Sequence, residues 1–252
     1  MKRTLLLTGG TGKFGHVLAR YFAEKGWDVV TTSREQARVN KLIKDIGPTQ
    51  GTIIGIAVDL QKPGMSQWLV DELSSRNISI SHLINNARSM DTLSVELDGT
   101  TARNVFIGEF EFDVIVPYEL SISLSRAVSH KLKTIVNIGS MYGEVAPNPA
   151  LYNGTLDRSP VQYGVSKAAL HHLTRELSVR LAPQHIRVNC VAYGGVEGRV
   201  DEEFMARYAQ LVPSRRMLKD LELIGPVEFL LEEGSSAVNG HVLLADGGWS
   251  VW

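Results

Sequence analysis

Apolar residues gather in short runs along this chain, and longer segments with apolar positions at helical spacing lie between the runs. The short runs contain few alternating polar residues, a pattern typical of strands in a parallel sheet that is covered on both faces. We therefore expect seven strands, at Thr4–Leu7, Val29–Thr32, Thr52–Val58, His82–Asn85, Thr134–Ile138, Arg187–Ala192 and His241–Ala245.

The longer segments carry apolar residues three or four positions apart, which predicts amphipathic helices. These segments are Phe14–Lys25, Arg34–Ile46, Ser66–Ser75, Glu111–Ser129, Pro160–Leu181, Glu202–Leu211 and Leu221–Leu231. Regular alternation of strand and helix predicts an α/β fold with a doubly wound parallel sheet. No repeat, low-complexity tract or linker divides the sequence, so we expect residues 1–252 to form a single domain.

Charge and cysteine content narrow the functional classes. The 252 residues carry a formal net charge of -1 without a basic block, so we expect no nucleic-acid partner and no membrane partner. Cys190 is the only cysteine, which excludes an intrachain disulfide and favours a reducing, cytoplasmic location. The neighbours His171 and His172 point about 100° apart on a helix, unlike the i, i+4 pair of a zinc site, so we expect no catalytic metal.

The segment from Thr8 to Gly15 joins the first predicted strand to the first predicted helix. Its glycines permit a tight turn, a close approach of backbone to a pyrophosphate, and close packing of the helix on the strand. This position in the chain favours a dinucleotide site over an ordinary turn. The expected cofactor contacts in the turn are Gly9, Thr11, Gly12, Lys13, Phe14 and Gly15.

The end of the second predicted strand bears on which dinucleotide is bound. An NAD-preferring site usually places a carboxylate there to bind the adenosine ribose, whereas this chain has Ser33 followed by Arg34. Ser33 does not repel a 2′-phosphate, and Arg34 attracts one. Lys13 adds a positive charge that we expect to reach the same phosphate. The sequence thus favours NADP over NAD, with solvated Arg34 and Lys13 side chains as the alternative.

Tyr163 and Lys167 lie four residues apart in a segment that predicts the start of a helix. Ser159 suits the N-cap, Pro160 the first helical position, and Gln162 the place from which a capping-box side chain reaches back. One helical turn places Tyr163 and Lys167 on the same face, where the ammonium favours the phenolate and makes the tyrosine a general acid/base. Taken alone, the pair also fits two surface side chains at helical spacing.

With these pieces in place, the chain resembles the classical short-chain dehydrogenase/reductase family along nearly its whole length. The matching residues, in order, are Gly9, Gly12, Gly15, Asp59, Asn85, Asn86, Ala87, Ser140, Tyr163, Lys167 and the run Asp246-Gly247-Gly248. The resemblance implies a Rossmann-like sheet and hydride transfer at C4 of a nicotinamide.

The same resemblance implies roles for particular residues. Tyr163 is the expected acid/base, Ser140 orients the reacting oxygen, and Lys167 holds the nicotinamide ribose. Other cofactor contacts implied by the resemblance are Asp59 and Leu60 at the adenine, Asn86 and Ala87 at the adenosine ribose, and Gly194 and Val196 after the sixth strand.

The chain also departs from the family pattern. Asp113 stands where we place the usual fourth catalytic residue, an asparagine, and its charge is expected to offset part of the effect of Lys167 on Tyr163. Arg88 replaces the glycine that normally follows Asn-Asn-Ala. The usual Pro-Gly after the sixth strand is Tyr193-Gly194, and the glycine turn has the spacing of the extended branch of the family.

The segment between Ser140 and Tyr163 is longer than is common in the family and rich in turn-forming residues. We expect a substrate-side loop at 143–159 and a substrate-side helix at 197–215. The expected substrate contacts, Arg88, Tyr142 and Arg158, suit a hydroxylated or phosphorylated small molecule. The loop and the C-terminal tail resemble, more loosely, a carbohydrate-acting branch of surface-glycan pathways. Simple surface decoration is the alternative for the loop.

Two classes of function remain open at this point. The first is an NAD(P)-dependent oxidoreductase that acts on a secondary alcohol or ketone of a sugar-like molecule, or an epimerase or dehydratase that recycles its cofactor. The second is a dinucleotide-binding regulator or scaffold with little turnover. The presence of Ser140, Tyr163 and Lys167 together favours an enzyme. By resemblance, the helices predicted at Glu111–Ser129 and Pro160–Leu181 pair to form a homodimer or homotetramer.

Overall fold

The computed structural model describes residues 3–198 and 200–252, and it contains a single seven-stranded parallel sheet within them. The strand order is β3-β2-β1-β4-β5-β6-β7. The strands are β1 (Thr4–Leu7), β2 (Asp28–Ser33), β3 (Ile53–Ala57), β4 (His82–Asn85), β5 (Thr134–Ser140), β6 (Arg187–Tyr193) and β7 (Val242–Ala245). All seven predicted strands are therefore present, each within two residues of its expected ends.

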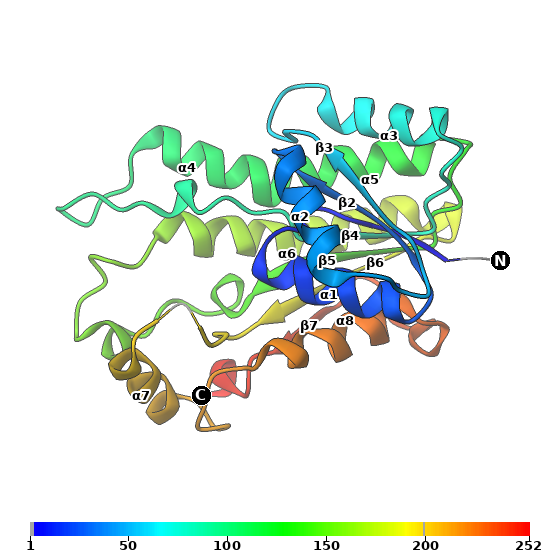
Figure 1. Ribbon diagram of the computed structural model, residues 1–252. Helices are drawn as coiled ribbons and strands as arrows, with labels where there is room; N and C mark the ends of the chain where they lie inside the picture. The colour runs from blue at the N-terminus through cyan, green and yellow to red at the C-terminus, as the bar shows by residue number, and fades with distance from the viewer. Residues whose placement is uncertain (1–2, 199) are drawn as a thin grey trace.

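Helices cover both faces of the sheet (Figure 1). They are α1 (Lys13–Glu24), α2 (Gln36–Ile46), α3 (Met65–Ser75), α4 (Arg103–Phe110), α5 (Val116–Arg126), α6 (Val161–Leu181), α7 (Glu202–Leu211) and α8 (Ile224–Leu231). One core packs α1, α2 and α8 against the sheet through residues such as Phe22, Leu42 and Val227. The other packs α3, α5 and α6 through Leu69, Leu120 and Leu177. The predicted doubly wound α/β fold is confirmed.

The order of the strands reverses between β1 and β4. The chain runs outward from β1 through β2 to β3, and then returns to place β4 on the other side of β1. In such sheets, ligands bind beyond the carboxyl ends of the strands at this switch point. The turns after β1, β4 and β5 meet there, so the residues that the sequence predicts to be functional gather at the carboxyl-terminal end of the sheet.

The predicted helix at Glu111–Ser129 differs from the structure. Helix α4 begins earlier, at Arg103, and a π-helical turn, η2 (Glu111–Ile115), joins it to α5, which ends at Arg126. A π turn inserts one extra residue into the helical ladder, and such turns occur frequently at functional sites. Asp113 lies within this turn.

The predicted capping box at the start of α6 is wrong. Pro160, not Ser159, occupies the N-cap position, and no side chain caps the helix there. The Gln162 side chain instead donates to the carbonyl oxygens of Thr92 and Ser94, at 3.0 and 3.2 Å. Gln162 is fully buried, and it satisfies backbone oxygens of the segment after β4 that would otherwise be costly to bury.

Candidate active site

A cleft of about 700 Å³ opens at the carboxyl ends of the strands, on both sides of the switch point. Its size suits a cofactor or a drug-sized ligand. The predicted cofactor residues that line it are Gly9, Thr11, Gly12, Lys13, Phe14, Gly15, Ser33, Arg34, Asp59, Leu60, Asn86, Ala87, Tyr163, Lys167, Gly194 and Val196. Ser140, Arg88 and Tyr142 line it as well.

The glycine turn has almost no room for side chains. Gly9 has a φ of +68°, and a Cβ atom on it would lie 2.7 Å from the Cα of Ala87. A Cβ on Gly15 would lie 2.4 Å from the carbonyl oxygen of Gly9. The buried hydroxyl of Thr8 accepts hydrogen bonds from the backbone N–H groups of Asn86 and Ala87, both at 2.9 Å. The turn after β1 is thus held tightly against the end of β4, and its backbone fits the cradle that a pyrophosphate needs.

Two arginines line the cleft at the end of β2. Arg34 lies 3.6 Å from the carboxylate of Asp91, but both side chains are at least half exposed, so this ion pair is weak. Arg38, from α2, lines the same end of the cleft. The hydroxyl of Thr11 donates to that of Ser33 at 3.2 Å. This end of the cleft therefore presents hydroxyl and guanidinium donors, with Asp91 as an exposed carboxylate.

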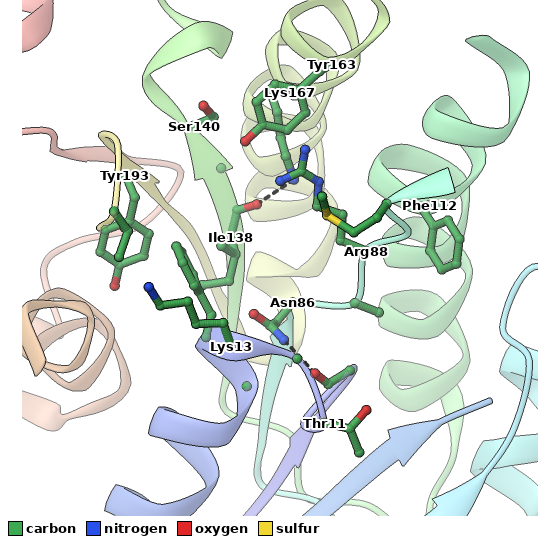
Figure 2. A pocket seen from close by; sticks show the side chains of 18 of the residues that line it. Thr11, Lys13, Asn86, Arg88, Phe112, Ile138, Ser140, Tyr163, Lys167 and Tyr193 are labelled. Carbon is green, nitrogen blue, oxygen red and sulfur yellow. Dashed lines mark hydrogen bonds between the residues drawn. The ribbon is translucent and has the colours of Figure 1, made fainter. Parts of the chain in front are cut away.

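Lys13 lies in the cleft but has other partners than the sequence predicts. Its ammonium hydrogen-bonds to the carbonyl oxygen of Glu197 and lies 3.0 Å from the carboxylate of Asp220. Figure 2 shows its side chain extended toward Tyr193 and away from Thr11. This side chain links the glycine turn to the segment after β6, and its contact with a 2′-phosphate stays a prediction. Both partners lie more than 180 residues away in sequence, so spacing alone gives no signal for them.

Three of the four residues with an expected catalytic role meet at the opposite end of the cleft. Ser140 ends β5, while Tyr163 and Lys167 project from the first turns of α6. Figure 2 shows the Tyr163 hydroxyl on the side of the cleft where Ser140 lies, with Lys167 beside the tyrosine ring. The Lys167 ammonium is 5.8 Å from the centre of that ring. The helical spacing thus places the phenol and the ammonium together, facing the end of β5.

Lys167 is anchored from behind by two acceptors. Its ammonium donates to the carboxylate of Asp113 at 2.7 Å and to the carbonyl oxygen of Ile138 at 2.9 Å. The second oxygen of Asp113 accepts from the Ser166 hydroxyl at 2.7 Å. Burial, the largest single influence, lowers the pKa of Lys167, but Asp113 and Tyr163 together outweigh burial and raise that pKa, which favours the charged ammonium. Asp113 itself lies behind Lys167 and does not line the cleft.

A second carboxyl group, which sequence analysis missed, is buried near this pair. Glu109 lies one helical turn before Asp113 and has no exposed surface. Its Oε2 atom accepts from the hydroxyl of Thr92, and its Oε1 atom has no partner among the described residues. Burial, together with the charge of Asp113, raises the pKa of Glu109 and favours its neutral form. A glutamate in an unremarkable helical segment gives no sequence signal for such a position.

Arg88 extends from the end of β4 across the face of the tyrosine. Its guanidinium carbon lies 4.3 Å from the centre of the Tyr163 ring, the geometry of a cation–π contact. Arg88 therefore contacts the expected acid/base directly. Figure 2 shows the guanidinium and Lys167 close together at the tyrosine.

The loop at 143–159 is hydrogen-bonded both to α7 and to Tyr142, which lines the cleft. The phenol oxygens of Tyr142 and Tyr152 lie 3.2 Å apart, and Arg207 of α7 donates to the Leu151 carbonyl oxygen at 3.0 Å. Beneath them is a buried apolar cluster of Met141, Leu151, Tyr208, Val212, Met217 and Trp249. Arg158 is exposed and is not among the residues that line the cleft. Of the three expected substrate contacts, the structure brings Arg88 and Tyr142 to the cleft and leaves Arg158 outside; residue 199 of the expected helix at 197–215 lies outside the described residues.

Some lining residues had no sequence prediction. Tyr193 is buried at the end of β6, and its ring meets that of Phe14 edge-on at 5.7 Å between centres. Arg38, Phe112 and Met141 also line the cleft. Arg38 lies one helical turn after Arg34, a signal that the sequence offered. The contact between Tyr193 and Phe14 joins residues far apart in the chain, so only the fold reveals it.

The described part of the chain, residues 3–198 and 200–252, contains neither a metal-binding cluster nor a membrane-spanning helix. No group of three or more histidine, cysteine, aspartate or glutamate side chains is placed to hold a metal ion. No helix within residues 3–198 and 200–252 is long and apolar enough to cross a membrane.

Known proteins resemble this chain over nearly its full length. Residues 13–250 match the family model described as Enoyl-(Acyl carrier protein) reductase. An uncharacterized oxidoreductase, YmfI, of Bacillus subtilis is 25% identical over 260 residues, which cover 99% of each protein. The post-translational flagellin modification protein A of Campylobacter coli is 34% identical over 117 residues, 46% of each protein.

A solved structure gives the same result for the fold. The short chain dehydrogenase of Leptospira borgpetersenii, determined with bound NAD+, superposes with a TM-score of 0.83 at 25% sequence identity. The match covers 99% of this chain and 93% of that protein. Three findings point to a dinucleotide-binding reductase. They are the glycine turn, in which Gly9 and Gly15 have no room for a side chain, the hydroxyl and guanidinium donors at the end of β2, and the family match over residues 13–250. This chain belongs to the short-chain dehydrogenase/reductase family and is an NAD(P)-dependent oxidoreductase.

Proposed function

We propose that this protein is an NADP-preferring oxidoreductase that interconverts a secondary alcohol and a ketone on a polar, sugar-like molecule. The observation that carries the proposal is the set of Ser140, Tyr163 and Lys167 at one end of the cleft, with Lys167 fixed by Asp113 and Ile138. A protein that only binds a dinucleotide has no need for an anchored ammonium beside a phenol that faces the cleft.

The proposed division of labour follows from the chemistry of these side chains. In reduction, the Tyr163 hydroxyl gives its proton to the carbonyl oxygen of the substrate; in oxidation, the phenolate takes the proton from the alcohol. Ser140 donates a hydrogen bond to the same oxygen and so fixes its position. Lys167 holds positive charge beside the phenol and has a donor left for a ribose hydroxyl. NAD(P)H, when bound, supplies the hydride.

Preference for NADP rests on the end of β2. Ser33 places a hydroxyl where a carboxylate would repel a 2′-phosphate, and Arg34 and Arg38 provide two guanidinium groups along the same wall. Guanidinium groups bind phosphate through paired N–H donors. The charge of Asp91 opposes this preference weakly, because its carboxylate is 79% exposed.

Preference for a polar substrate rests on the groups that surround the reacting end. The Arg88 guanidinium and the Tyr142 phenol line the cleft there. Tyr142 is hydrogen-bonded to Tyr152 of the loop at 143–159, which supports a place for this loop beside the substrate. The name of the Campylobacter coli relative, a post-translational flagellin modification protein, supports a role in the modification of a protein. Asp59 and Leu60 at the adenine, and Asn86 with Ala87 at the adenosine ribose, complete the proposed site.

We also propose that the protein is a homodimer or a homotetramer. Helices α4 to α6 carry apolar side chains that are about half exposed, namely Ile107, Ile115, Val161 and Val165. Apolar surface of this kind is commonly covered by a partner. Light scattering at decreasing protein concentration is the test, and a monomer at all concentrations would contradict the proposal. The cytoplasmic location stays a prediction.

The decisive experiment is a substrate screen with both cofactors. Sugar phosphates, nucleotide sugars and simple ketones are each mixed with the protein and NADPH or NADH, and cofactor absorbance is followed. We expect oxidation of NADPH with at least one sugar-derived ketone, faster than with NADH. Absence of turnover with every compound and both cofactors would favour the binding-protein alternative. Product formed without net cofactor consumption would favour an epimerase or dehydratase.

A further inference from the structure

Lys167 is not the only charged side chain that determines the electrostatic field at Tyr163. Lys167 is the expected activator of the phenol, but its ammonium lies 2.7 Å from the Asp113 carboxylate, and both groups are almost fully buried. The two charges of such an ion pair sum to zero, so the field of Asp113 offsets part of the field of Lys167 at a neighbouring side chain. Lys167 therefore has only part of its positive field available to stabilise a phenolate.

Arg88 supplies the positive charge that this pair lacks. Its guanidinium lies 4.3 Å from the ring centre of Tyr163, closer than the 5.8 Å of the Lys167 ammonium. In the described residues, no carboxylate lies within ion-pair distance of Arg88, so its charge is not cancelled locally. A guanidinium keeps its charge at all relevant pH values, and it stacks on aromatic faces better than an ammonium.

The other titratable groups near the tyrosine leave this balance unchanged. Glu109 is drawn toward its neutral form because burial and Asp113 raise its pKa. His171, behind Lys167 on α6, is neutral near pH 7 because burial lowers its pKa to about 4. Tyr142, on the substrate side, also stays neutral because burial, above all, raises its pKa far above the ordinary value. The net charge facing Tyr163 thus comes from Lys167, Asp113 and Arg88 together.

We propose that Arg88 is the residue that activates Tyr163 in this protein, and that it compensates for the neutralisation of Lys167 by Asp113. Arg88 acts through the tyrosine ring and is therefore a positioning residue for the reaction. Arg88 and Asp113 contribute opposite charges to the same cluster around Tyr163 and Lys167. The proposal rests on Tyr163 as the acid/base of the proposed function.

The test follows the ionisation of Tyr163 without any substrate. Tyrosinate absorbance is titrated with base in the wild type and in Arg88→Gln, and each curve is corrected with its own Tyr163→Phe counterpart to isolate one tyrosine. We expect the Arg88→Gln curve to move to higher pH, with the phenolate fraction at a fixed pH on the rising limb reduced about tenfold. Identical curves for the wild type and Arg88→Gln would overturn the proposal.

Further variants separate charge from shape. Arg88→Lys keeps the charge and should restore part of the shift, whereas Arg126→Gln removes an exposed arginine at the end of α5 and should leave the titration unchanged. Asp113→Asn added to Arg88→Gln should move the curve back toward that of the wild type, because it releases the field of Lys167. A shift as large in Arg88→Lys as in Arg88→Gln, or no recovery in the double variant, would contradict a charge-based role.

The titration is independent of turnover. If the wild type reduces no ketone but the Arg88→Gln curve still shifts, the proposed function fails while the electrostatic role of Arg88 stands. If ketones are reduced and the curve does not shift, the role of Arg88 fails alone. Circular dichroism and NADPH affinity of each variant verify that the fold and the cofactor site persist.

Discussion

The two ends of the cleft are built by different means. At the cofactor end, backbone geometry determines the shape of the binding site, because Gly9 has a positive φ and a side chain on it would collide with the Ala87 backbone. At the reacting end, side-chain charges determine the reactivity of Tyr163: Arg88 and Lys167 lie at its ring, and Asp113 holds Lys167 from behind. The first arrangement tolerates little change, and the second is adjusted by single substitutions. Binding of the cofactor and reactivity are therefore expected to respond to separate mutations.

The largest effect that would test this separation is loss of the proton-transfer group. Tyr163→Phe should reduce turnover by about a hundred- to ten-thousand-fold, because general acid/base groups contribute this much. Its affinity for NADPH, measured by calorimetric titration, should stay close to that of the wild type. A variant that keeps nearly full activity would contradict the role of Tyr163. A variant that loses cofactor affinity and turnover in parallel would contradict the separation between cofactor binding and reactivity.

A mutation of the glycine turn should have the opposite profile. Gly9→Ala places a Cβ atom 2.7 Å from the Cα of Ala87 at a φ of +68°, so the turn has to move. Left-handed strain and overpacking together cost roughly 2–3 kcal/mol, which corresponds to a loss of NADPH affinity of about thirty- to 160-fold. Gly225→Ala, in α8 with no atom within 4 Å of the added Cβ, is the matched control and should bind NADPH normally. Equal affinities in both variants would contradict a backbone-determined cofactor site.

The choice between cofactors should depend on side chains even at the binding end. Arg34→Asp removes a positive charge beside the proposed 2′-phosphate position and adds a negative one. We expect NADPH affinity to fall about tenfold while NADH affinity changes little, since about 1.4 kcal/mol corresponds to a factor of ten. Arg126→Asp controls for a general change in net charge. Unchanged dissociation constants for both cofactors in Arg34→Asp would disprove the NADP preference.

A smaller change in the reacting end should alter the pH dependence alone. Asp113→Asn keeps a hydrogen-bond acceptor for Lys167 but removes the negative charge that offsets it. The positive field on Tyr163 then increases, the phenolate forms at lower pH, and the rising limb of the oxidation rate moves toward acid. At mildly acidic pH we expect a three- to tenfold faster oxidation, with the maximal rate preserved. A pH profile that superimposes on that of the wild type would show that Asp113 has no electrostatic role in the reaction.

The difference between features set by local backbone patterns and features set by long side chains explains which parts of the structure the sequence predicts well. The seven strands and the glycine turn are local patterns of apolar runs and small residues, and they appear in the structure as expected. The segment from Arg103 to Arg126 does not, because its π-helical turn interrupts the helical periodicity on which the prediction depends. Gln162 has the right spacing for a capping box, yet its side chain serves buried carbonyl groups of a distant loop.

Candidate site residues follow the same rule. Residues that act through position in a turn or at a strand end, such as Gly12, Asp59 and Ser140, line the cleft where the sequence places them. Lys13 is held near Asp220 by tertiary contacts, and Arg158 is exposed and does not line the cleft. The stacking of Arg88 on Tyr163 joins segments 75 residues apart. Charges of long side chains are thus located only by the fold.

Isotope transfer is the most direct test of whether this chain moves a hydride between a nicotinamide and a carbonyl compound. The ketone that the wild type reduces fastest is incubated with NADPH carrying deuterium at C4 of the nicotinamide, once with each face labelled. Deuterium is expected at the carbinol carbon of the product for one labelled face, and none for the other. A product without deuterium from either label would contradict direct hydride transfer and, with it, the assignment of this cleft as an oxidoreductase site.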